Sequence, residues 1–227
     1  MRILAIETSG RDASLAVLEG VDGDAARLVR QVIISGQQRT AQVLSPRLRD
    51  LLEEVAWPVA SIRLVIVVVG PGSFTGLRIG VTTAKTLAYA IGAEVIGVNT
   101  LAVVAEQAPP TASPLWVVTD AQRQELFAAK FDGERQIIHE TTILSQADWL
   151  RLLARGDYVT GPGLRRFGSA LPAEVHVVEE SLWLPMASAV GKIGWRDFRA
   201  GRRDDVWKLV PQYYRPSAAE EKAATKQ

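Results

Sequence analysis

Residues 70–80 read Gly-Pro-Gly-Ser-Phe-Thr-Gly-Leu-Arg-Ile-Gly and join an apolar run to an alanine-rich segment. The apolar run, Leu64–Val69, is almost entirely β-branched, which is typical of a strand buried on both faces of a helix-covered sheet. The glycines on either side of Pro71 permit positive φ and the proline fixes its own φ, so the strand ends there. Because the serine or the threonine that follows can cap a helix, the sequence predicts a strand, a tight loop and a helix N-terminus.

The predicted loop has two interpretations. A helix N-terminus exposes free N–H groups and the positive end of the helix dipole, so it could hold a phosphate or a carboxylate. A tight turn that binds nothing explains the same residues. The P-loop pattern requires Gly-x4-Gly-Lys-Ser/Thr, but Leu77 follows Gly76 here, so no lysine is placed for nucleotide phosphates.

Small residues recur at every fourth position of the predicted helix: Gly76, Gly80, Ala84, Ala88 and Gly92. This spacing puts them on one stripe of the helix surface, where another backbone can approach closely. Glycine in a helix interior costs about 0.5–1 kcal/mol relative to alanine, so the stripe needs a packing reason. The stripe either packs inside the chain or forms a helix–helix interface with another chain.

A hairpin with an acidic residue at its first bend occurs twice in the sequence. The strands are 3–6 and 13–18 around Glu7 in the first half, and 115–118 and 125–131 around Asp120 in the second half. This duplication fits the α/β fold of the actin-like sugar kinases, in which two lobes face each other across a cleft. Three prolines between 108 and 114 exclude regular structure and mark the lobe boundary. We expect an N-terminal lobe over 1–108, a smaller C-terminal lobe over 109–216 and a polar tail over 217–227.

Other periodic segments complete the predicted order of elements. We expect strands near 27–35, 94–98, 158–160 and 174–178, and helices near 40–54, 145–153 and 186–199. The helix over 40–54 is amphipathic, and Pro46 either bends it or ends its first turn. Its apolar face comprises Val43, Leu44, Leu48, Leu51, Leu52 and Val55.

Composition excludes several classes of protein. The chain has 227 residues, 48% of them hydrophobic and 22% charged, which is enough for one sizeable core or two modest ones. A net charge of +1 argues against a strongly basic nucleic-acid surface, and no apolar run approaches the roughly 18 residues that span a bilayer. The first residues do not resemble a secretory signal, so we expect a cytoplasmic protein without a membrane partner.

Metal and thiol chemistry are not expected. The sequence has no cysteine, which rules out disulfides, thiolate catalysis and cysteine-based zinc sites. Its two histidines, His139 and His176, are far apart in sequence and are interpreted as ordinary surface or strand residues. We predict no metal, no cofactor and no catalytic residue.

Residues 70–80 closely resemble the signature of the bacterial TsaB (YeaZ) family, the accessory subunit in the synthesis of threonylcarbamoyladenosine on transfer RNA. Further blocks are similar to that family in the same order: Ile3–Ser9 with Ala13–Val17, Gly97–Leu101, Asp120–Phe127 and Pro211–Arg215. The resemblance spans nearly the whole chain, and only the loop-helix signature is highly specific. It implies the duplicated actin-like fold (ASKHA, the sugar-kinase and Hsp70 type) with a reduced second lobe.

The resemblance also implies partners. It implies a non-catalytic scaffold that pairs with the catalytic subunit TsaD and the ATPase TsaE, forms a homodimer in isolation, and meets transfer RNA weakly or indirectly. The two predicted helices would form the pairing surface. Its residues would be Val43, Leu44, Leu48, Leu51, Gly76, Gly80, Ala84 and Ala88. We therefore expect Gly80→Leu to abolish pairing and to leave a folded monomer.

Two departures from the family matter. The family often has His-Ser-Glu at the start of its first long helix, whereas Thr40-Ala41-Gln42 stands here, so no role of that histidine transfers. TsaD binds a metal through two histidines on one helix, and no such pair exists in this sequence.

Two alternatives to the scaffold stay open. An enzyme with its own nucleotide-hydrolysing or peptidase-like activity would use the cleft, where Glu7 and Asp120 occupy the bends; Gln122 and Arg123 would crowd a phosphate there, which favours a vestigial site. A purely homodimeric interaction protein is the other alternative.

One cluster of basic residues could contact RNA. It comprises Arg196, Arg199, Arg202, Arg203, Lys208 and Arg215. Because Asp197, Asp204 and Asp205 are interleaved with them, a solvated helix end is the favoured interpretation. We expect the isolated chain to bind transfer RNA weakly.

Overall fold

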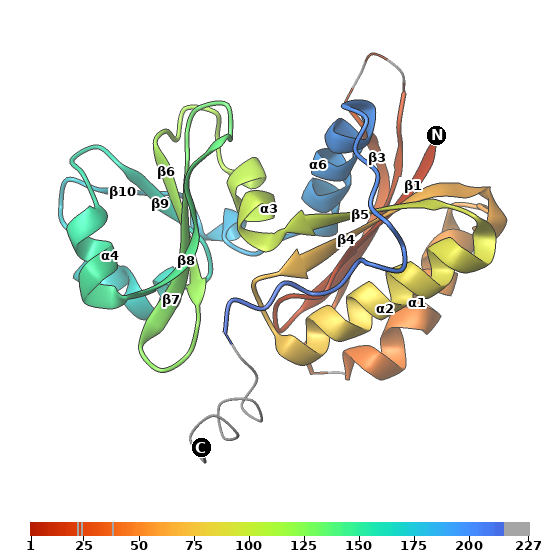
Figure 1. Cartoon of the computed structure of the whole chain (residues 1–227), viewed down its shortest axis with the longest axis horizontal. Helices are drawn as coiled ribbons and strands as arrows, with labels where there is room; N and C mark the ends of the chain where they lie inside the picture. The colour runs from red at the N-terminus through yellow and green to blue at the C-terminus, as the bar shows by residue number, and fades with distance from the viewer. Residues whose placement is uncertain (22, 24, 38, 216–227) are drawn as a thin grey trace.

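The two predicted hairpins each lie at the centre of a five-stranded sheet in the computed structural model, which describes residues 1–21, 23, 25–37 and 39–215 (Figure 1). The first sheet has the order β3-β2-β1-β4-β5 and the second the order β10-β9-β6-β7-β8. The first comprises β1 (Arg2–Glu7), β2 (Ala13–Glu19), β3 (Arg27–Ile34), β4 (Ile62–Gly70) and β5 (Glu94–Asn99). The second comprises β6 (Leu115–Asp120), β7 (Glu125–Phe131), β8 (Ile137–Ser145), β9 (Tyr158–Thr160) and β10 (His176–Val177).

The two sheets repeat one topology. In the first, β1 pairs antiparallel with β2 and parallel with β4, and the outer pairs β2–β3 and β4–β5 are antiparallel and parallel respectively. In the second, β6 pairs antiparallel with β7 and parallel with β9, and β7–β8 and β9–β10 follow in the same way. The duplication predicted from the sequence is confirmed.

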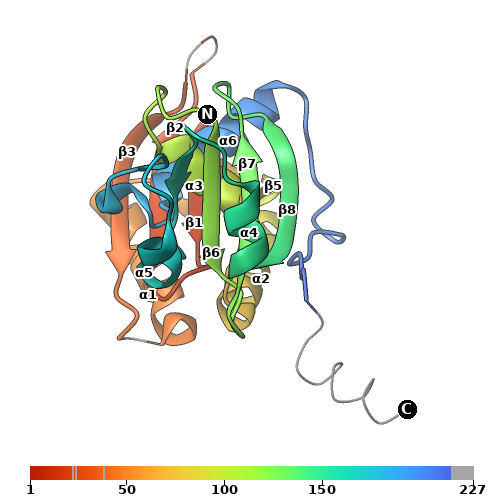
Figure 2. The ribbon, with the colours of Figure 1, turned by 90° about the vertical axis from the view of Figure 1, so that its left-hand side faces the viewer.

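Helices cover both faces of the first sheet, which explains why β1 and β4 are almost fully buried (Figures 1 and 2). On one face, Leu4, Val65 and Val67 pack against α1 (Thr40–Glu54) and α2 (Phe74–Ile91). On the other, the alternate residues Ile3 and Ile66 pack against α3 (Thr100–Gln107) and α6 (Ala187–Arg199). The β-branched run before the glycine-rich loop is therefore the buried strand that its composition predicted.

The second sheet is also covered on both faces. Trp116 lies on the face that packs against α4 (Gln146–Leu152) and α5 (Leu164–Phe167), together with the buried Trp149. The opposite face packs on α3 through Leu101 and Val104, whereas Val103 of the same helix belongs to the core of the first lobe. Helix α3 therefore lies between the two sheets, as Figure 1 shows. Short 3₁₀ turns are found at Val59–Ser61, Gly168–Ala170 and Glu180–Leu182.

The chain returns to the first lobe after β10. Val190 and Ile193 of α6 contact Ile3 and Ala5 in the core of the first lobe, and the segment after α6 runs beside α2 (Figure 1). The predicted second lobe of 109–216 therefore differs from the packing, because α6 packs against the first sheet and only the last described residues return to the second lobe. The predicted tail of 217–227 lies outside the described residues.

Four of the five small residues of the stripe are buried inside the chain, and Gly92, just beyond the helix, is exposed. Gly76, Gly80, Ala84 and Ala88 all face the first lobe, and a Cβ on Gly76 or Gly80 would overlap Thr8 at the end of β1. The stripe thus lets α2 approach the first hairpin closely. Of the two uses predicted for the stripe, the structure shows packing inside the chain. The sequence analysis expected these four residues to contact a partner. This expectation is corrected, because all four are buried within the chain.

The same correction applies to the predicted interface residues of α1. Leu44, Leu48 and Leu51 are buried in the core of the first lobe, and Val43 is half-buried against it. An amphipathic helix that packs on a sheet buries its apolar stripe against that sheet. The apolar stripe of α1 therefore packs on the first sheet of its own chain. The surface left by the two helices is their polar outer face.

Candidate functional site

The bend after β1 holds a buried carboxyl group. Oε1 of Glu7 accepts hydrogen bonds from the backbone N–H of Ser9, at 2.7 Å, and from its hydroxyl, at 2.5 Å. Only 1% of Glu7 is exposed. Burial raises the pKa of Glu7 to about 7, because the charged form is poorly solvated, and the two bonds from Ser9 oppose this shift. Glu7 is therefore a group that can change charge near neutral pH.

The bend after β6 is built on the same plan but is closed by an ion pair. Oδ1 of Asp120 accepts the backbone N–H of Gln122 at 2.7 Å, two residues on, as Glu7 does with Ser9. The Asp120 carboxylate also lies 3.0 Å from the guanidinium of Arg166. Both acids thus satisfy the N–H groups of their own turns.

The second bend exposes side chains where a phosphate would need bare backbone. Gln122, Arg123 and Gln124 all have positive φ, at 65°, 52° and 62°. Such values are uncommon for residues with side chains, and three in succession make a compact left-handed turn. Because glycine is absent from this turn, its side chains project from the bend that would face a phosphate.

Each lobe has a Gly-Pro-Gly loop that presses on its own bend. Gly70 ends β4 with φ of 127° and Gly161 follows β9 with φ of 107°. A Cβ on Gly72 would lie 2.6 Å from Ser9, and one on Gly163 would lie 3.1 Å from Thr119. Positive φ therefore favours glycine at Gly70 and Gly161, and close approach to the neighbouring hairpin requires Gly72 and leaves little room for a side chain at Gly163.

The helix that follows the first of these loops is capped by its own chain. The Ser73 hydroxyl accepts the N–H of Gly76 at 3.2 Å, and the N–H of Ser73 donates to the carbonyl of Ser9 at 2.7 Å. Ser73 is therefore the N-cap residue of α2, and it is one of the two residues, Ser73 and Thr75, that the sequence offered for this role. These bonds favour the tight-turn interpretation of the loop over an anion site.

A cleft of about 1020 Å³ lies between the two bends. Residues of both lobes and of the C-terminal segment line it, including the aromatic side chains of Phe74, Phe127, Tyr213 and Tyr214. The segment crosses from one lobe to the other: the N–H of Gln212 donates to Val69 at 2.7 Å, and Arg215 donates to the carbonyl of Ala121 at 2.9 Å. The sequence analysis placed Arg215 in a basic cluster and did not predict that this C-terminal segment connects the two lobes. Residues 211–215 had been noted only because they are similar to a block of the TsaB family.

The rest of the basic cluster is largely paired within the chain. Arg202 lies 2.8 Å from Asp197 and 2.9 Å from Asp204, and Arg196 lies 3.1 Å from Glu106. Arg203 stacks over Phe198 at 3.4 Å. These contacts agree with a solvated helix end, the interpretation that the interleaved aspartates favoured.

The two histidines lie far apart in the second sheet. His139 is in β8 and His176 is in β10, at opposite edges of the sheet, and each contacts an aromatic ring, Trp116 and Tyr158 respectively. Within residues 1–21, 23, 25–37 and 39–215, no three histidine, aspartate or glutamate side chains come together in a way that could hold a metal. In the same residues no helix is long and apolar enough to cross a membrane.

The family is established by comparison with known proteins. A family model described as "TsaD: tRNA N6-adenosine threonylcarbamoyltransferase" matches residues 30–171, more than half of the chain. The tRNA threonylcarbamoyladenosine biosynthesis protein TsaB of Bacillus subtilis is 25% identical over 233 residues, covering 98% of this chain and 97% of its own. The chain belongs to this family, as a TsaB (YeaZ) member.

Further relatives agree with membership of the TsaB family. An uncharacterized protein of Mycobacterium tuberculosis is 31% identical over 219 residues, covering 94% of this chain and 91% of its own. The solved structure of YeaZ from Pseudomonas aeruginosa has a TM-score of 0.78 at 24% identity, over 93% of this chain and 99% of that one. The fold is accordingly the duplicated actin-like (ASKHA-type) fold expected for TsaB proteins, with two matching five-stranded sheets.

Proposed function

We propose that this chain takes part in threonylcarbamoyladenosine biosynthesis on transfer RNA as a non-catalytic scaffold. In this proposal it pairs with a TsaD-type catalytic subunit and a TsaE-type ATPase, so that the catalytic subunit can transfer the threonylcarbamoyl group. The names of its TsaB relatives in Bacillus subtilis and Escherichia coli and the match to the TsaD family model support this role.

The bonding of the two acids at the bends, Glu7 and Asp120, supports the proposal that the chain is not catalytic. In a phosphate-transferring enzyme, acids must be free to hold a cation and water near bare backbone. Here the Asp120 carboxylate is bonded to Arg166 and to its own turn, and Glu7 is buried and bonded to Ser9. Asp120 is thus paired with a cation of its own chain, and burial disfavours the charged form of Glu7, so neither acid suits a divalent cation beside a phosphate.

The partner surface is proposed for the outer face of α1 and α2. The buried stripes of both helices pack against the first lobe of the chain itself. Pairing must therefore use exposed positions such as Thr82 and Thr86. Beside them lies an aromatic pair: Tyr89 is 66% exposed and Trp207 is 69% exposed, with ring centroids 5.0 Å apart. Large exposed aromatic side chains are the commonest anchors of protein interfaces. A second copy of the chain could occupy the same face in isolation.

The test measures threonylcarbamoyl transfer to transfer RNA with TsaD, TsaE, ATP and threonylcarbamoyl-adenylate, with and without this chain. We expect transfer to require the chain, and Tyr89→Glu or Trp207→Glu to weaken binding to TsaD by about tenfold or more. Leu152→Glu, an exposed apolar residue on α4 of the other lobe, is the matched control and should change neither readout.

Two outcomes would contradict the proposal. Transfer that proceeds equally well without the chain would remove the scaffold role. Unchanged affinity for TsaD in both aromatic variants would show that Tyr89 and Trp207 are not part of the surface that binds TsaD.

A further inference from the structure

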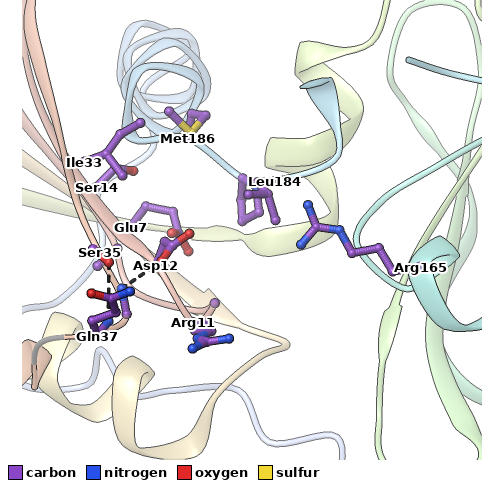
Figure 3. Close-up of a pocket in the computed structure, with 14 residues that line it drawn as sticks. Glu7, Arg11, Asp12, Ser14, Ile33, Ser35, Gln37, Arg165, Leu184 and Met186 are labelled. Carbon is purple, nitrogen blue, oxygen red and sulfur yellow. Dashed lines mark hydrogen bonds between the residues drawn. The ribbon is translucent and has the colours of Figure 1, made fainter. Parts of the chain in front are cut away.

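A second pocket opens on the other side of the first bend (Figure 3). Its volume is about 410 Å³, within the range of small-molecule sites. Glu7, Asp12 and Arg11 come from the first hairpin, and Arg165 reaches in from the second lobe. Part of the wall is apolar and is formed by Ala13, Ile33, Leu184, Pro185 and Met186.

The acidic side of this pocket has unused bonding capacity. Oε1 of Glu7 is bonded to Ser9, but no described residue donates a hydrogen bond to its Oε2, although the side chain is almost fully buried. Asp12 is bonded through Oδ1 to the N–H of Gly36 at 2.7 Å. Oε2 is not one of the fully buried polar atoms that lack a partner among the described residues, so it reaches the pocket, where a ligand that brings a donor can bond to it.

The opposite side of the pocket has unused donors. Nε of Arg165 donates to Glu180 at 3.0 Å, which leaves the terminal nitrogens of its guanidinium without a partner among the described residues. Figure 3 shows this guanidinium turned toward Leu184 and the acids across the pocket. Free guanidinium donors are suited to a carboxylate.

The nearby N-terminus of α6 does not compete for an anion. The N–H of Ala187 donates to the Ser14 hydroxyl at 2.9 Å, and the N–H of Ser188 donates to Oε1 of Gln31 at 2.8 Å. These first N–H groups of the helix are therefore satisfied by the first sheet. The charged groups that line the cavity are Glu7, Asp12 and the adjacent Arg11 on one side and Arg165 on the other.

We propose that this pocket binds a small zwitterion of the α-amino acid type, with its ammonium group on Glu7 and Asp12, its carboxylate on Arg165 and a short apolar side chain against Leu184 and Met186. The ammonium supplies the donor that Oε2 of Glu7 lacks. Because the ligand touches both lobes, it bridges them. This site does not rest on the proposed scaffold role, and no step of that role uses it.

The test is a ligand-observed NMR titration of the full chain with each proteinogenic L-amino acid, up to about 10 mM, since small ligands of this size commonly bind in the millimolar range. We expect saturable binding of at least one amino acid with a short apolar side chain. Its N-acetyl derivative, which lacks the ammonium, and its methyl ester, which lacks the carboxylate, should bind about tenfold more weakly or worse.

Two variants locate the binding. Glu7→Gln and Arg165→Gln should each weaken binding by about tenfold or more, whereas Arg151→Gln, an exposed arginine of α4, should leave it unchanged. Circular dichroism and thermal unfolding establish that each variant is folded, and Arg165→Gln changes only an exposed side chain. No saturable binding of any amino acid, or binding that both variants leave intact, overturns the proposal.

Discussion

The guanidinium of Arg166 lies 3.0 Å from the carboxylate of Asp120 and so occupies the acid that the second lobe offers to the cleft. Asp120 is equivalent by topology to Glu7, and the two acids differ in how they are neutralised. One is paired with a cation at the surface, and the other is buried where its charged form is disfavoured.

Asp120→Asn tests whether the cleft is used in catalysis. The pair is partly exposed on both sides, so its loss should lower the free energy of unfolding by less than about 1 kcal/mol. We expect threonylcarbamoyl transfer in the reconstituted mixture to stay within about twofold of wild type, a change of less than about 0.5 kcal/mol in activation free energy. Loss of transfer with binding to TsaD intact would indicate a working site in this cleft.

Glu7 predicts a pH dependence of stability. Its folded pKa, about 7, lies above its ordinary value of 4.5, so the folded chain keeps a proton that the unfolded chain has lost. This contribution is full below pH 4.5 and is lost as the pH rises to about 7. The charged groups that line the same pocket are Arg11, Asp12 and Arg165.

Denaturant unfolding of wild type and Glu7→Gln at several pH values measures this dependence. Relative to wild type, the glutamine variant should gain on the order of 3 kcal/mol between pH 4.5 and pH 7.5, at about 1.4 kcal/mol per pKa unit. A stability difference that does not change with pH would mean that the buried carboxyl does not titrate in this range.

Gly80→Leu should destabilise the fold rather than only separate partners. A Cβ at this position already overlaps the Thr8 side chain, and the larger leucine would push α2 off the first hairpin. We expect a loss of about 3 kcal/mol or more in chemical denaturation, whereas Thr82→Leu on the exposed face of the same helix should cost less than about 1 kcal/mol. A stable Gly80→Leu monomer would restore the earlier expectation of an interface there.

Asp157 is a buried acid of the second lobe that accepts three hydrogen bonds. It is 2% exposed, and its Oδ2 accepts hydrogen bonds from Lys130 at 2.9 Å, from the Trp116 indole at 3.1 Å and from the N–H of Ala154 at 3.0 Å. Asp157→Ala leaves these donors without an acceptor and should cost about 3–5 kcal/mol.

The control for Asp157→Ala is Glu54→Ala, which removes an exposed ion pair with Arg30. It should cost less than about 1 kcal/mol in the same denaturation experiment. Equal losses in the two variants would show that burial of the carboxylate is not what makes Asp157 important.

Local patterns predicted most of the first lobe. The β-branched run of β4, the Gly-Pro-Gly stop and the Ser73 cap each act within a few residues, and the strands and helices they predict are present. Helix α3 and strand β8 were not predicted. Thr100–Gln107 is buried against both sheets and therefore lacks an amphipathic pattern, and Ile137–Ser145 is half-exposed with charged residues among its apolar ones.

The candidate site was predicted only in part. The acids at the bends follow from the hairpin pattern, and both lie where the duplication placed them. The roles of Arg165 and Arg166 were missed because two adjacent arginines on a short helix look like an ordinary solvated turn; only tertiary structure shows that one faces Asp120 and the other the pocket beside Glu7. Most of the predicted interface residues are buried in their own chain for a related reason: periodicity shows that a stripe is apolar or small but not which molecule covers it.

Helix α3 has a consequence for how the molecule comes apart. Val103 is part of the first core, and Leu101 and Val104 are part of the second. Removing this helix from either sheet exposes apolar surface of both, so neither lobe can melt and leave the other's core intact. We therefore expect a single cooperative transition in calorimetry, with equal calorimetric and van't Hoff enthalpies, instead of the two separate transitions that a chain of independent lobes would give.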